Sequence, residues 1–170
     1  MPHGTELASL KPLLPVFISY VLSFINIGIY WNNHHHMIHT AKHVNGSVLW
    51  ANIHLLFWLS LVPFVTGWMG ENNFAKWPVI LYGIVLLMAG FAYYLLAHCL
   101  TASHGKDSTL AMAIGKDRKG ILSIIIYAAG VALSFINPLL GLAMYIIVAG
   151  MWFIPDSRIE KKWKQELSNK

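Results

Sequence analysis

Five long apolar stretches occupy most of this chain and restrict its fold more than any other feature of the sequence. They span about residues 13–36, 48–68, 77–100, 121–136 and 138–154. About 20 helical residues cross the hydrocarbon core of a bilayer, and a helix satisfies its own backbone hydrogen bonds there. The stretches lack the alternating pattern of a membrane barrel. The sequence therefore predicts an all-α fold, a polytopic membrane helical bundle with five spans.

The composition excludes most classes of soluble protein. Hydrophobic residues make up 56% of the 170 residues and charged residues 11%, whereas an average soluble domain has about 25% charged residues. A soluble domain of this size cannot bury so much apolar surface. The net charge of +5 rests on few basic residues, so no nucleic-acid partner is expected.

The last two stretches are separated only by Asn137 and Pro138. Asn-Pro is a turn signal, and the residue before a proline is disfavoured in the helical region. Read as one segment, the two stretches would be too long for a single span. We therefore expect a tight helical hairpin at this point.

The distribution of Lys and Arg over the loops predicts the orientation. If successive loops alternate between the two sides, one side collects nearly all of these residues, and the positive-inside rule places that side in the cytoplasm. We expect a multi-pass protein of the cell membrane with a cytoplasmic C-terminus. Residues 1–155 then form a single transmembrane domain. Residues 156–170 form a basic cytoplasmic tail, either as a helix on the lipid surface or as a solvated segment.

Polar side chains recur along one face of the first predicted helix, at Ser19, Ser23, Asn26 and Tyr30. Steps of three or four residues keep them on the same side of a helix. Two interpretations stay open, namely packing against neighbouring helices and direct lining of a pore. All seven acidic residues lie outside the five stretches, which argues against a carboxylate-driven pump.

Histidines cluster at the end of the first stretch, and eight of the nine fall on the predicted cytoplasmic side. Clustered imidazoles bind metals, change charge near neutral pH, or form hydrogen-bonded networks. His36 and His39 begin the His-x-x-His-His box of membrane di-iron enzymes, but Thr40 occupies its last place. We therefore assign no metal-binding, catalytic or cofactor-binding residue. A histidine-metal membrane oxidoreductase remains the alternative, and pH sensing a hypothesis.

Three segments carry a resemblance to a known family. They are GIYWNNHHH at residues 28–36, LFWLSLVPF at residues 56–64 and INPLLGLAMY at residues 136–145. Together they resemble the transmembrane protein 175 family of potassium channels in its short prokaryotic form. The resemblance covers nearly the whole chain.

The resemblance implies a potassium-selective leak channel, not an enzyme, with no cofactor. It implies six helices per repeat and a homotetramer, so the expected partners are potassium ions, further copies of the chain and membrane lipids. In the family, the first helix lines the pore, provides a hydrophobic constriction and carries the signature Arg-x-x-x-Phe-Ser-Asp. That signature does not occur here, and we expect the pore-lining helix to be missing from this sequence, through a misassigned start codon or in a shortened paralogue.

The resemblance also indicates four residues of interest. Asn33, His34 and His35 match the motif on the second family helix, and Trp31 matches a packing position beside it. In the family this region packs against the Phe-Ser-Asp element. We expect the four residues to form a network that braces or gates the pore. A non-conducting structural or regulatory subunit is a further alternative.

Overall fold

The computed structural model describes residues 7–39, 41, 43–104 and 118–153. Within this part, a short 3-10 helix, Leu7–Leu13, precedes five α-helices and no strand occurs. The helices are α1 Leu14–His39, α2 Gly46–Glu71, α3 Lys76–His104, α5 Arg118–Ser134 and α6 Pro138–Phe153. The predicted all-α membrane bundle is confirmed. The predicted basic tail, residues 156–170, lies outside the described residues.

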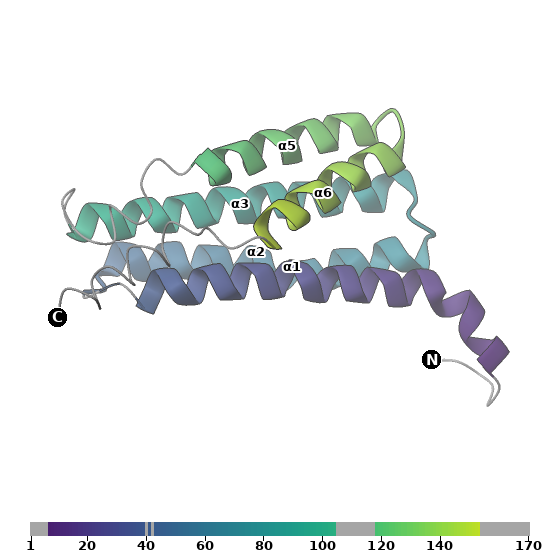
Figure 1. The fold of residues 1–170 in the computed structure, drawn as a ribbon, viewed down its shortest axis with the longest axis horizontal. Helices are drawn as coiled ribbons and strands as arrows, with labels where there is room; N and C mark the ends of the chain where they lie inside the picture. Colours follow the sequence, from purple (N-terminus) through teal and green to yellow (C-terminus); the bar gives the residue numbers. More distant parts are fainter. Residues whose placement is uncertain (1–6, 40, 42, 105–117, 154–170) are drawn as a thin grey trace, which may run out of the picture.

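The helices run alternately up and down along one common direction (Figure 1). The α2 helix lies against α1 and α3, and α5 lies against α3 and α6. The α1–α2 connection and the C-terminal end of α3 meet at one end of the bundle, where the rings of His43 and His104 stack with centroids 6.3 Å apart. We call this the histidine end; the α2–α3 and α5–α6 connections lie at the opposite end.

Two of the five helices are shorter than the others. The α1, α2 and α3 segments are long and apolar enough to cross a membrane, whereas α5 and α6 are apolar helices of 17 and 16 residues. At 1.5 Å per residue, such helices are about 25 Å long, against about 30 Å of hydrocarbon core. The α5–α6 hairpin therefore covers only part of the bundle's length (Figure 1).

Local capping explains where the helices begin and end. The Asn45 side chain accepts a hydrogen bond of 3.0 Å from the backbone N–H of Val48 and so caps the start of α2. In the same way, the Asn137 Oδ1 atom accepts from the N–H of Leu139 at 2.9 Å, at the start of α6. The turn between the two helices thus comprises residues 135–137, directly before Pro138, and α5 ends at Ser134 rather than at residue 136.

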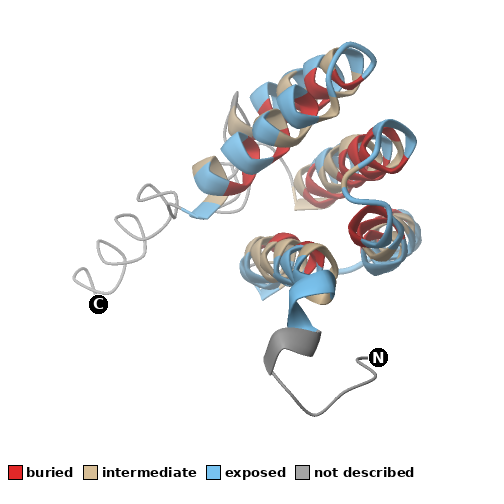
Figure 2. Cartoon of the chain, turned by 90° about the vertical axis from the view of Figure 1, so that its right-hand side faces the viewer, coloured by how far each residue is buried: buried red, intermediate tan, exposed pale blue. Residues whose placement is uncertain are grey.

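The core lies where the helices face one another, and the exposed side chains lie on the outside of the bundle (Figure 2). Tyr82 of α3 and Tyr145 of α6 are fully buried at its centre, with ring centroids 5.6 Å apart and planes at 85°. The Tyr145 hydroxyl is 3.2 Å from the Ser134 Oγ atom. These contacts hold the hairpin against α3 and set the position of α6 beside α1.

Candidate functional site

The α1 helix has two faces with different surroundings. Ser19, Ser23 and Asn26 are buried inside the chain. On the opposite side lies a row of exposed aromatic residues, which we call the outer row: Phe17, Tyr20, Phe24 and Trp31. The predicted polar face therefore contacts other helices of the same chain, and the outer row faces away from them.

The polar face joins α1 to α2 and α3. The Ser19 hydroxyl donates to the Val16 carbonyl at 2.8 Å, and its side chain fills the space beside Gly70 of α2. The Asn26 Nδ2 atom donates to the Leu22 carbonyl at 3.0 Å and to the Tyr82 hydroxyl at 2.9 Å. Both arrangements are typical of polar side chains packed between membrane helices.

His34 connects the end of α1 to α2. Its Nε2 atom lies 2.6 Å from the Oδ1 atom of Asn52. Because an amide oxygen only accepts hydrogen bonds, the Nε2 atom must carry the hydrogen and donate it. Asn33, the preceding residue, instead donates from Nδ2 to the Ile29 carbonyl of its own helix at 2.8 Å.

Trp31 and His35 lie on the outer side of α1. Their rings are stacked, with centroids 5.4 Å apart and planes at 17°, and the His39 ring follows at 5.9 Å from His35. Trp31 is 64% exposed. The structure therefore brings Trp31 together with His35 and His34 together with Asn52, but it does not join the four predicted residues in one network.

The other described histidines form pairwise contacts. The Trp58 indole donates to His54 Nε2 at 3.0 Å, and the backbone N–H of His43 donates to His104 Nε2 at 3.1 Å. Among the described residues, no group of three His, Cys, Asp or Glu side chains is placed to hold a metal ion. The geometry of these imidazoles is that of helix packing and ring stacking.

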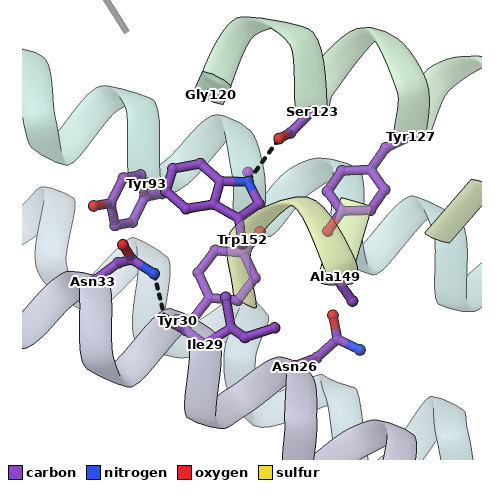
Figure 3. A pocket seen from close by; sticks show the side chains of 11 residues that line it. Asn26, Ile29, Tyr30, Asn33, Tyr93, Gly120, Ser123, Tyr127, Ala149 and Trp152 are labelled. Atoms are coloured by element: carbon purple, nitrogen blue, oxygen red, sulfur yellow. Dashed lines mark hydrogen bonds between the residues drawn. The ribbon is translucent and has the colours of Figure 1, made fainter. Parts of the chain in front are cut away.

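A pocket between α1, α3, α5 and α6 is the feature that the sequence indicates least. Asn26, Tyr30 and Asn33 line it from α1, next to residues of the other three helices (Figure 3). The latter residues are Gly90, Tyr93, Gly120, Ser123, Tyr127, Ala149 and Trp152, with Ile29 completing the α1 side. Since these residues come from separate helices, no spacing within the sequence connects them.

Comparison with known proteins assigns the chain to a family. The family model described as endosomal/lysosomal potassium channel TMEM175 matches residues 1–63. A Chryseobacterium protein named potassium channel HX13_20290 is 50% identical over 165 residues, which cover 97% of this chain and 86% of that protein. Potassium channel B446_29190 of Streptomyces collinus is 27% identical over 142 residues, 79% of this chain and 69% of that protein. No solved structure matches the chain. By its identity to the first relative and the match of the family model, the chain belongs to the TMEM175 family of potassium channels.

Proposed function

We propose that this chain is a subunit of a potassium-selective leak channel in the cell membrane, with its C-terminus in the cytoplasm. The observation that carries this proposal is the 50% identity, over 97% of the chain, to a protein named a potassium channel. We propose further that four copies surround a central pore, whose hydrophobic constriction belongs to a helix with the family's Arg-x-x-x-Phe-Ser-Asp signature. Residues 1–155 then form the channel-type domain.

The distribution of charge is compatible with this mechanism. Within the described helices the only acidic residue is Glu71, the last residue of α2. A hydrophobic constriction needs no buried carboxylate, because it selects ions by the cost of stripping their water. Potassium holds its hydration shell less tightly than sodium, so potassium passes such a constriction more readily.

The two faces of α1 suggest what this chain contributes. The buried face and the His34–Asn52 hydrogen bond fix α1 to the rest of the bundle. The outer row and the Trp31–His35 stack are then available to support the pore helix. In this proposal Trp31, Asn33, His34 and His35 hold the scaffold around the pore and do not contact the ion.

Ion flux in liposomes tests the proposed function. The protein is produced once as these 170 residues and once with any in-frame upstream codons of its gene, and both forms are reconstituted in vesicles. We expect potassium flux that exceeds sodium flux in the form that carries the Arg-x-x-x-Phe-Ser-Asp helix. Equal potassium and sodium flux, or no flux from either form, would contradict the proposal.

A further inference from the structure

The pocket between α1, α3, α5 and α6 contains two amide oxygens, of Asn26 and Asn33, that none of the hydrogen bonds described above uses. Its cavity volume is about 30 Å³, and its walls are mainly the rings of Tyr30, Tyr93, Tyr127 and Trp152 (Figure 3). A cavity of this volume holds about two groups the size of a water molecule, such as a hydroxyl and the carbon atom that bears it.

Two amide oxygens face this pocket. Asn26 and Asn33 each donate from Nδ2 to the backbone carbonyl four residues earlier, at 3.0 and 2.8 Å. If the oxygen and nitrogen of either side-chain amide were exchanged, the side-chain oxygen would face a backbone carbonyl oxygen. These hydrogen bonds therefore determine which atom of each amide is the nitrogen. Both oxygens therefore point away from the carbonyls of their own helix, and the Asn26 oxygen points toward the interior of the pocket (Figure 3).

The oxygen of Asn26 has no hydrogen-bond donor among the described residues. No fully buried side-chain nitrogen or oxygen in that part of the chain lacks a partner. Although Asn26 as a residue is only 3% exposed, its oxygen must therefore be reachable from the pocket. A ligand that donates a hydrogen bond would satisfy this acceptor.

The surrounding charges select an uncharged donor. The pocket lining contains no acidic residue, and the Lys119 Nζ atom lies 5.5 Å from the centre of the Trp152 ring. A cation would lose its hydration shell beside this positive charge and gain no counter-charge in the lining. An anion would face the two amide oxygens. A neutral hydroxyl group meets neither penalty.

The pocket is narrow at Gly90. A methyl group added there would already lie 3.6 Å from Ile124 Cγ1, 3.7 Å from the Tyr30 hydroxyl and 3.8 Å from Tyr127 Cδ2. Such a gap admits a linear chain more easily than a ring.

We propose that this pocket binds the hydroxyl head of a linear aliphatic alcohol, with the Asn26 oxygen as acceptor and the apolar tail in the surrounding lipid. This binding does not depend on ion conduction. The ligand class is a primary alcohol with an unbranched apolar chain. A free alkanol and a lipid with a free hydroxyl share that chemistry.

Photolabelling in liposomes tests the site. The probe is octanol that carries a diazirine, and labelled peptides of the 170-residue chain are identified by mass spectrometry. We expect labels at Tyr93, Tyr127 or Trp152 that an excess of 1-octanol suppresses and an excess of octane does not. A monoacylglycerol added as a competitor shows whether a lipid hydroxyl occupies the same site.

The substitution Gly90→Ala is expected to reduce labelling of the pocket about tenfold, because its methyl group takes the space of the ligand at ordinary contact distances. The matched control is Gly28→Ala, since a side chain at Gly28 meets nothing within 4 Å; labelling should be unchanged. Equal labelling of wild type and the Gly90 variant would overturn the proposal. So would equal labelling of the wild type by a diazirine-bearing octane, a comparison that needs no variant.

Discussion

The Tyr145 hydroxyl of α6 occupies the space that a side chain at Gly83 of α3 would need. The two helices can approach each other at this point only because Gly83 has no Cβ atom. The same ring lies against Gly130 of α5, and its hydroxyl pairs with the Ser134 Oγ atom. One tyrosine therefore joins three helices.

The substitution Gly83→Ala should destabilise the protein by about 1–3 kcal/mol, the usual cost of overpacking a core. The added methyl group would displace Tyr145 and break its contact with Ser134. Thermal unfolding in detergent measures the effect. Gly67→Ala is the control, because a Cβ at Gly67 meets nothing within 4 Å; equal stability of the two variants would refute the argument.

The hydrogen bond between Asn26 and Tyr82 should have a small but measurable energy. Bonds between membrane helices contribute about 0.6 kcal/mol on average. We expect a coupling of about this size in a double-mutant cycle with Asn26→Leu and Tyr82→Phe, followed by unfolding in detergent. Additive effects of the two substitutions would mean that the 2.9 Å contact makes no contribution.

The His34–Asn52 bond should act as a single unit. Replacing Asn52 with Leu leaves the Nε2–H group of His34 without its partner, at a cost of about 1 kcal/mol or more. In a His34→Ala background the same substitution should have little effect. Unfolding in detergent measures stability, and potassium flux in liposomes shows whether the bond also matters for conduction. An equal loss of stability on Asn52→Leu in the wild type and in the His34→Ala background would rule out this pairing.

The outer row should matter for conduction more than for folding. If Trp31 supports the pore helix, Trp31→Ala should reduce potassium flux about fivefold, the factor that corresponds to about 1 kcal/mol. Trp50 of α2 is 73% exposed and provides the same substitution elsewhere on the surface. Flux should be unchanged in Trp50→Ala, and an equal reduction in both variants would point to a general effect on the membrane.

The fold class could be predicted because it follows from the length of the apolar stretches alone. The bounds of α5 could not, since the helix begins at Arg118 and includes Lys119, which belong to no apolar pattern. A helix N-terminus depends on local capping and backbone geometry, and hydropathy does not report either. The turn directly before Pro138 could be predicted, because proline restricts the backbone of the residue before it.

For the candidate site, too, the sequence predicted some features and not others. Residue spacing placed Ser19, Ser23 and Asn26 on one face, but it could not identify the partner of Asn26, which lies 56 residues further along the chain. His34 and His35 have different partners because of helix geometry, since the side chains of adjacent helical residues point about 100° apart. The pocket needed the structure, since its aromatic walls come from four helices.

The shortness of α5 and α6 affects the lipid as well as the protein. The hydrophobic length of the α5–α6 hairpin is shorter than that of α2. The bilayer would therefore have to become thinner beside the hairpin. Acyl chains of modest length would then gather around the hairpin and longer ones around α2. A protein of this shape would sort its own lipid neighbours and respond to the thickness of the membrane in which it resides.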